Sequence, residues 1–229
     1  MKPVLYGIVD GNWYLHRMYH ASRGRAPAIA VVRLILKDAS SLGITHLGVA
    51  FDSKTNFRKS ITTTYKANRS LSPVIELLKL TKEELKRQGI KVYHKKEYEA
   101  DDVIASFCQL YTPCVVFSAD KDLFQCAGLG ISFYNSISGK LETSGANRGI
   151  TLDYQILVGD KTDNVEGELQ NKPALARKLL GIFGNYKDAA HSLNLNMKKI
   201  EKTRKLVTLV TSLKLGKPTL VKTKNKGLF

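Results

Sequence analysis

The stretch that decides the fold is Glu99-Ala100-Asp101-Asp102-Val103-Ile104-Ala105-Ser106-Phe107. Three carboxylates stand within its first four residues and an apolar run follows, which is typical of a helix start. A capping role at the positive end of the helix dipole accounts for one or two of these acids. Carboxylates so close together repel one another unless a cation neutralises them, and hard cations such as Mg²⁺ prefer carboxylate oxygens. The stretch therefore predicts either a capped helix or a metal site.

Further aspartates follow short apolar runs elsewhere in the chain. They are Asp10 after residues 4–9, Asp52 after residues 47–51, Asp120 and Asp122 after residues 114–118, and Asp160 and Asp163 after residues 156–159. Short β-branched and aromatic runs with helices between them indicate buried strands of a parallel sheet. Ligand sites of such sheets lie at the carboxyl ends of the strands. We therefore expect Asp10, Asp52, Asp120 and Asp122 to converge there.

Helices are expected between these strands, and the fold class is α/β with a central, mostly parallel sheet flanked by helices. A hairpin over residues 131–143 is expected at the sheet edge, because Ser138-Gly139 separates two short strands. Apolar residues at helical spacing predict helices at residues 12–20, 28–42, 73–89, 99–107, 151–158, 173–183 and 194–215.

The charge balance points to a polyanionic substrate. The chain has 229 residues, with 36 Lys and Arg against 20 Asp and Glu, a net charge of +16. Nine of the 20 acids belong to the groups named above, which leaves 11 acids against 36 bases in the rest. Acids concentrated in a basic body suit a metal-dependent enzyme that acts on a polyanion.

The composition argues against a membrane protein. No apolar run approaches the roughly 18 residues of a membrane span, and no signal peptide is visible. Cys108, Cys114 and Cys126 lie in apolar contexts and are expected to be reduced core thiols. We therefore expect a cytoplasmic protein.

Three basic regions are candidates for nucleic-acid contacts. Residues 53–72 carry Lys and Arg with Phe57 and Tyr65 between them, and their weak apolar periodicity predicts a segment that is mobile until it binds a single strand. An ordinary basic loop is the alternative. Arg17, close behind Asp10, is either a phosphate contact or a surface residue. Residues 160–183 predict a loop and helix that clamp a duplex backbone.

The motifs together resemble one family. They are Asp10-Gly11-Asn12, Phe51-Asp52, Tyr65-Lys66-Ala67-Asn68-Arg69, Glu99-Ala100-Asp101-Asp102, Ser118-Ala119-Asp120-Lys121-Asp122 and Gly159-Asp160-Lys161-Thr162-Asp163-Asn164-Val165. In this order they resemble the flap endonuclease and 5′ to 3′ exonuclease family, in particular phage enzymes and the 5′ nuclease domain of bacterial DNA polymerase I. The resemblance covers nearly the whole chain.

This resemblance implies hydrolysis of DNA phosphodiesters by a two-metal mechanism in replication or repair. It implies two or more Mg²⁺ ions, for which Mn²⁺ can substitute. The implied ligands of the first ion are Asp10, Asp52, Glu99, Asp101, Asp102 and Asp120, and those of the second are Asp122, Asp160 and Asp163. Lys66 and Arg69 would meet the scissile phosphate and, with Asp120 and Asp122, form the catalytic set. Tyr65 would stack on a terminal base, and Arg17, Lys172, Arg177 and Lys178 would contact DNA.

The resemblance also implies an architecture and a substrate. A PIN-like nuclease core would span residues 1–150 with a helical arch at residues 53–72, a helix-loop-helix DNA-binding module residues 151–216, and a flexible basic tail residues 217–229. The substrate would be DNA with a 5′ flap or a free 5′ end, and RNase H activity on an RNA–DNA hybrid stays open. The chain would act as a monomer.

The chain departs from the family in residues 164–173. Family members carry a glycine-rich turn there, whereas this chain has a single glycine, Gly167. Glu166 and Glu168 would repel DNA there. This argues against a potassium site and predicts a weaker grip on duplex, or a partner that compensates. Gly227-Leu228-Phe229 predicts either docking to a sliding clamp or a disordered end. A single-strand-binding protein is the other candidate partner.

Two alternative functions stay open at this stage. One is a ribonuclease on a PIN-type core, although the basic segment and the helix-loop-helix argue against it. The other is a nonenzymatic DNA-binding protein whose acids are structural caps, although clustered acids are costly for a pure binder. A nucleotide-binding protein is excluded at the sequence level, because no Gly-x-x-x-x-Gly-Lys-Ser/Thr loop is present.

Overall fold

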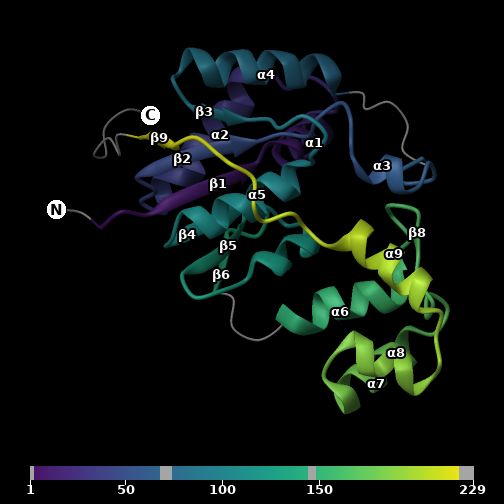
Figure 1. The fold of residues 1–229 in the computed structure, drawn as a ribbon. Coiled ribbons are helices and arrows are strands. Elements are labelled where there is room, and N and C mark those ends of the chain that lie inside the picture. The colour runs from purple at the N-terminus through teal and green to yellow at the C-terminus, as the bar shows by residue number, and fades with distance from the viewer. Residues whose placement is uncertain (1–2, 68–73, 144–147, 222–229) are drawn as a thin grey trace. The chain divides into compact units, whose positions relative to one another are not determined.

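The computed structural model describes residues 3–67, 74–143 and 148–221, and the chain forms two compact units (Figure 1). We call them the sheet unit, residues 1–55, 72–144 and 210–229, and the helical unit, residues 56–71 and 145–209. These boundaries differ from the predicted ones. Residues 56–67 of the basic segment belong to the helical unit, and the C-terminal segment returns to the sheet unit.

The sheet unit is built on a seven-stranded sheet with the order β3-β2-β1-β4-β5-β6, in which β9 also pairs with β2. Neighbours among β3, β2, β1, β4 and β5 are parallel, whereas β6 and β9 are antiparallel to β5 and β2. The strands are β1 Tyr6–Asp10, β2 His46–Ala50, β3 Lys91–Tyr93, β4 Cys114–Phe117, β5 Ile131–Asn135, β6 Lys140–Thr143 and β9 Thr219–Leu220. The predicted parallel sheet and its edge hairpin are confirmed.

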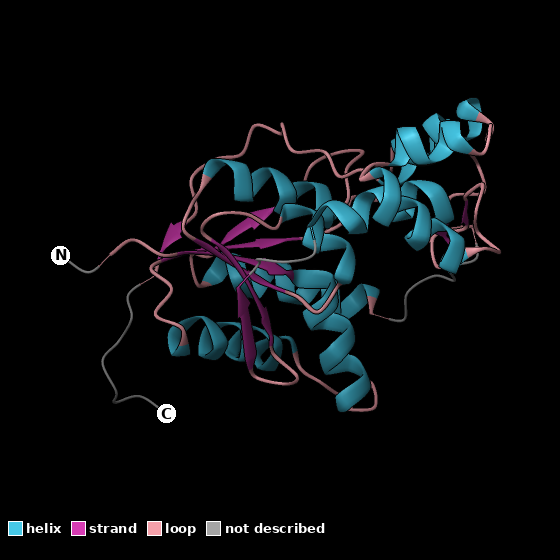
Figure 2. Ribbon diagram, turned by 90° about the horizontal axis from the view of Figure 1, so that it is seen from below, coloured by secondary structure: helices cyan, strands magenta, loops and turns pink. Residues whose placement is uncertain are grey.

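Helices cover both faces of this sheet (Figure 2). Val9, Val49 and Phe117 point to the face where α1, α2 and α4 pack, and all three side chains are fully buried. On the other face the ring of Phe107 in α5 lies 5.8 Å from that of Tyr93. The helices are α1 Gly11–Ala21, α2 Ala28–Ser41, α4 Ile75–Arg87, α5 Ala100–Leu110 and the 3₁₀ helix η1 Lys121–Cys126.

The C-terminal segment is hydrogen-bonded to the sheet unit from Val210 as far as Val221. Ser106 Oγ donates to the Val210 carbonyl and accepts from the Leu213 N–H, and Tyr93 donates to the Gly216 carbonyl at 2.6 Å. The predicted flexible tail from residue 217 is therefore wrong for its first part, which contains β9. The sliding-clamp motif at residues 227–229 lies outside the described residues.

The helical unit contains α3 Arg58–Ile61, α6 Arg148–Val158, α7 Pro173–Phe183, α8 Tyr186–Ser192, α9 Met197–Val207 and the small hairpin of β7 Gly159–Asp160 with β8 Val165–Glu166. The predicted helices at residues 151–158 and 173–183 are confirmed, whereas the last helix is shorter than predicted and ends at Val207. Gly159 and Gly167 allow a close approach of backbones, since a Cβ at Gly167 would lie 2.2 Å from the Val158 carbonyl carbon. No helix among the described residues is long and apolar enough to cross a bilayer.

Candidate active site

Asp10 is the buried acid at the carboxyl end of the central strand β1. It caps α1, because its Oδ1 accepts the Trp13 N–H at 3.0 Å. Its Oδ2 accepts the Ser118 hydroxyl at 2.9 Å, and the same Ser118 oxygen accepts the Asp120 N–H at 3.1 Å. Asp120 in turn caps η1 by accepting the Asp122 N–H. A single hydroxyl thus joins the ends of β1 and β4, and Asp10 and Asp120 lie at the same sheet edge as their positions predict.

The carboxylates at this edge repel one another, and the effect shows in the pKa of Asp10. Burial raises the pKa of Asp10 to about 7, against hydrogen bonds from Trp13 and Ser118 that lower it. The carboxylates of Asp52 and Asp120 add to the rise, which places both within electrostatic range of Asp10. Like charges that face one another in a buried setting favour a bound cation.

The acidic stretch at the start of α5 has the capping role that its sequence predicts, and its role as a metal site stays a prediction. Glu99 and Asp102 form a capping box, in which Asp102 Oδ2 accepts the Glu99 N–H. Asp52, at the end of β2, accepts the Ala100 N–H at 2.8 Å. Asp102 is fully buried, and its Oδ1 accepts the Val210 N–H. Its two oxygens therefore stabilise the fold directly, while half-buried Asp101 and exposed Asp52 keep more open surroundings.

The carboxylates of the sheet unit do not close around one point. Among the described residues, no three side chains of His, Cys, Asp or Glu stand close enough to hold a metal ion. The donor set nevertheless fits a divalent cation, because it consists of hard carboxylate oxygens around a buried acid with a raised pKa. Side-chain rotation of the half-buried and exposed acids would be needed to bring them onto one ion.

Two residues at this edge were missed by sequence reasoning. Ser118 lies within a quoted motif, but nothing in the sequence shows that its hydroxyl joins Asp10 to Asp120. Lys82 lies on α4, with its Nζ 4.8 Å from the centroid of the Phe51 ring. Burial lowers the pKa of Lys82, against the nearby Asp52 carboxylate, which raises it. Lys82 lies within an ordinary amphipathic helix, so nothing in the sequence distinguishes it from the other lysines of α4.

The helical unit holds the remaining predicted ligands. Asp160 forms a tight turn by accepting the Thr162 N–H at 2.8 Å. Asp163 Oδ2 lies 3.3 Å from Lys66 Nζ and accepts the Tyr65 hydroxyl at 3.2 Å. The backbone repeats the link, since the Lys66 N–H donates to the Asp163 carbonyl and Lys66 adopts a left-handed φ of 52°. Lys66 and Asp163, predicted to have different catalytic roles, are therefore partners of one another.

Residues 56–67 of the basic segment are a packed part of the helical unit, contrary to the predicted mobility. Tyr65 is 2% exposed and belongs to the hydrophobic core of the unit, so its ring is not presented for stacking on a base. Arg58 is 1% exposed, and its guanidinium donates to the carbonyls of Leu206 and Thr208 at the end of α9. A cation at a helix C-terminus is favourable, which explains its burial. Residues 68–73, including Arg69, lie outside the described residues.

Of the residues predicted to contact DNA, one is bonded inside the protein and three are exposed to solvent. Arg17 donates to Ser136, whose hydroxyl donates to the buried Asp38, so Arg17 is part of an internal network. Lys172, Arg177 and Lys178 are exposed at the start and along α7, as a backbone clamp requires. The Arg177 guanidinium lies 5.0 Å from the centroid of the Tyr154 ring.

A parallel α/β sheet with acids at the carboxyl ends of β1, β2 and β4 defines a class of fold and site that metal-dependent phosphodiesterases share. The family model for the N-terminal resolvase-like domain of 5′-3′ exonucleases matches residues 5–152. This chain belongs to the 5′-3′ exonuclease family, which confirms the resemblance.

Individual relatives agree with this assignment. The chain is 29% identical to the 5′-3′ exonuclease of Aquifex aeolicus in an alignment 260 positions long, gaps included, which covers 96% of this chain and 89% of that protein. It is 30% identical to DNA polymerase I of Rhizobium leguminosarum over 78% of this chain, and it spans only 20% of that polymerase. The flap endonuclease of bacteriophage T5, solved in complex with DNA and metal ions, shares the fold with a TM-score of 0.72 at 21% identity, covering 89% of this chain and 86% of that one.

Proposed function

We propose that this chain is a structure-specific 5′ nuclease that hydrolyses DNA phosphodiesters near a 5′ flap or a free 5′ end. The observation that carries the proposal is Asp10, a buried carboxyl at the end of β1 whose pKa is raised to about 7 beside Asp52 and Asp120. A purely structural cap gains nothing from such neighbours. A divalent cation would relieve the repulsion.

The proposed ions are Mg²⁺, with Mn²⁺ as a substitute. Asp10, Asp52, Glu99, Asp101, Asp102 and Asp120 are the proposed ligands of one ion, with Asp102 the weakest candidate because backbone N–H groups occupy both of its oxygens. Asp122, Asp160 and Asp163 are the proposed ligands of a second. When bound, the ions would supply Lewis-acid stabilisation of the phosphate and activation of water.

The chain's own residues would hold and polarise the substrate. Lys66 presents a half-buried ammonium that would offset negative charge on the scissile phosphate, and it would have to exchange Asp163 for the phosphate to do so. Ser118 would act as a positioning residue, because it fixes Asp10 relative to Asp120. Exposed Lys172, Arg177 and Lys178 would contact the duplex backbone.

The substrate assignment rests on charge and on the relatives. A net charge of +16 suits a polyanion, and the phage relative was solved with DNA. DNA with a 5′ flap is the proposed preferred substrate, and an RNA–DNA hybrid is a further candidate. A weak grip on duplex without potassium stays part of the proposal, because exposed Glu166 at the end of β8 would repel the phosphate backbone, although Glu168 is paired with Lys199.

A cleavage assay on an end-labelled 5′ flap, with Mg²⁺ and with EDTA as control, tests the proposal. We expect a product cut near the junction with Mg²⁺ and none with EDTA. Parallel lanes hold a 5′-recessed duplex, an RNA–DNA hybrid and single-stranded RNA. Cutting confined to single-stranded RNA would support the PIN-type ribonuclease instead. Tight DNA binding without any cleavage in Mg²⁺ or Mn²⁺ would support a nonenzymatic DNA-binding protein.

A further inference from the structure

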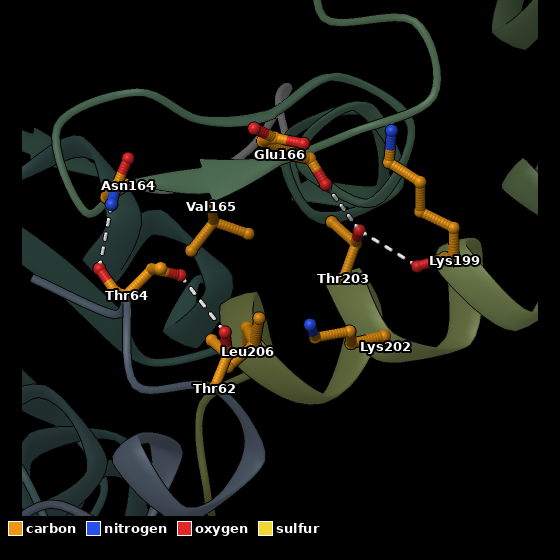
Figure 3. A pocket seen from close by; sticks show the side chains of 9 residues that line it. All are labelled: Thr62, Thr64, Asn164, Val165, Glu166, Lys199, Lys202, Thr203 and Leu206. Atoms are coloured by element: carbon orange, nitrogen blue, oxygen red, sulfur yellow. Dashed lines mark hydrogen bonds between the residues drawn. The ribbon is translucent and has the colours of Figure 1, made fainter.

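A pocket of about 440 Å³ lies within the helical unit, and none of the carboxylates assigned above lines it (Figure 3). Its walls come from three segments: residues 62–64 after α3, residues 164–166 around β8, and the face of α9 that carries Lys199, Lys202 and Thr203. Val165 and Leu206 contribute an apolar floor. A volume of this order is enough for a nucleotide-sized group.

The lining groups supply hydrogen-bond donors. Thr62 and Thr64 share one hydrogen bond at 3.0 Å between their hydroxyl oxygens, so one of the two hydroxyl protons stays available for a ligand. Asn164 uses one amide hydrogen on the Thr64 carbonyl at 2.9 Å, which leaves its second hydrogen. Thr203 is committed to the fold, since its hydroxyl lies within hydrogen-bond distance of the Glu166 and Lys199 carbonyls.

Lys202 provides the positive charge of the pocket. Figure 3 shows its ammonium reaching along α9 toward Leu206, while the Glu166 carboxylate points away from it. Lys199 is different, because its Nζ is paired with Glu168 at 3.3 Å. Within the described part of the chain, Lys202 has no such ion pair. An ammonium beside spare hydroxyl and amide protons is the chemistry that recognises a phosphate oxygen.

We propose that this pocket binds one phosphate group of a nucleic-acid strand, with Lys202 as the charged contact and Thr62, Thr64 and Asn164 as hydrogen-bond donors. The proposal rests on the nuclease function, and it adds a binding subsite on α9 that is separate from the cleavage residues. The pocket is close to the cleavage residues in sequence, since Thr64 lies two positions before Lys66 and Asn164 follows Asp163. The phosphate is either an internal diester or a 5′-terminal monoester.

The test compares Lys202→Ala with Lys198→Ala, an exposed lysine on the same helix outside the pocket. Fluorescence anisotropy in EDTA measures binding to a single strand from about 50 to 200 mM salt, with 5′-phosphate and 5′-hydroxyl versions of one sequence. We expect Lys202→Ala to weaken binding about 3- to 10-fold and to flatten the slope of log K against log[salt] by about 0.7. Lys202→Arg should restore the slope, and Thr62→Val should weaken binding without changing it.

The two probes identify the phosphate. An equal loss with both ends supports an internal diester, whereas a loss confined to the 5′-phosphorylated strand supports the terminal monoester. Equal affinity and slope for Lys202→Ala and Lys198→Ala would overturn the pocket proposal. The flap assay judges the nuclease separately, because a wild-type chain that binds DNA and never cuts it refutes the nuclease function, not the subsite.

Discussion

The two units neutralise their acidic residues in opposite ways. In the sheet unit, Asp10 is buried beside Asp52 and Asp120, and its pKa is raised. In the helical unit, Asp163 lies next to Lys66 and accepts the Tyr65 hydroxyl. One set of carboxylates repels itself and the other has an internal cation. The difference indicates that a cation would stabilise the acids of the sheet unit directly, whereas an ion held by Asp163 would first have to displace Lys66.

The largest expected effect is the loss of cleavage when the sheet-unit acids are changed. Asp120→Asn keeps the cap on η1 but removes a charge, so we expect flap cleavage in Mg²⁺ to fall by about 10⁴-fold while DNA binding in EDTA is retained. Single-turnover rates on the flap measure it, and Asp122→Asn should behave alike. Glu142→Gln on the exposed strand β6 is the control. Normal cutting by Asp120→Asn would remove the basis for the metal assignment.

The variant Tyr65→Ala tests whether Tyr65 stabilises the core of the helical unit or stacks on a base. Because Tyr65 is buried in the helical unit, truncation should lower the free energy of unfolding by about 4 kcal/mol. Tyr65→Phe, which keeps the ring and loses the hydroxyl that donates to Asp163, should cost about 1 kcal/mol. Urea denaturation measures both. A Tyr65→Ala protein of unchanged stability that binds 5′ ends weakly would restore the stacking role.

The raised pKa of Asp10 predicts a pH dependence of the metal-free protein. The folded pKa is about 7 and the unfolded one about 3.8, so the folded state holds the extra proton between these values. Stability should therefore fall as pH rises from about 4 to about 7, by on the order of 4 kcal/mol relative to Asp10→Asn. The side-chain amide of that variant keeps an oxygen for the Trp13 N–H. Denaturation of both proteins across this range, in EDTA, measures the difference, and parallel curves would contradict it.

The smallest expected effect on cleavage is that of Lys66→Ala, which tests the helical unit. Loss of the ammonium should lower the turnover number by about 100-fold with little change in KM, because the charge matters most when negative charge develops on the phosphate. Lys59→Ala, on the exposed side of α3, is the matched control. If Lys66 only neutralises Asp163, then Asp163→Asn should rescue the variant's stability, and Lys66→Ala alone should leave turnover unchanged.

The sheet and the placement of its acids could be predicted from the sequence. Runs such as residues 4–9 and 114–118 are apolar, β-branched and bounded by turn residues, and an Asp at the end of each run falls at one sheet edge by the geometry of parallel strands. The acidic stretch at α5 was ambiguous between a cap and a ligand set. The structure shows why, since Glu99 and Asp102 cap the helix at the same edge where Asp10 is buried.

The contacts of the basic segment could not be predicted. Tyr65 and Arg58 look exposed in a sequence rich in Lys and Thr. Tyr65 is instead buried in the core of the helical unit, and Arg58 is buried against the end of α9, more than a hundred residues later. The two-residue strand β9 likewise carries no periodicity to detect. Long-range packing overrides local composition at such positions.

The bond from Val210 to Asp102 has a practical consequence for anyone who shortens this protein. A truncation before Val210 would take away a donor from a fully buried carboxylate and would also strip Ser106 of its two backbone partners. Such a fragment should express poorly, even though it would contain every acid of the sheet edge. A minimal version of the sheet unit would have to splice residues 210–221 back onto it, for example through a short linker in place of the helical unit.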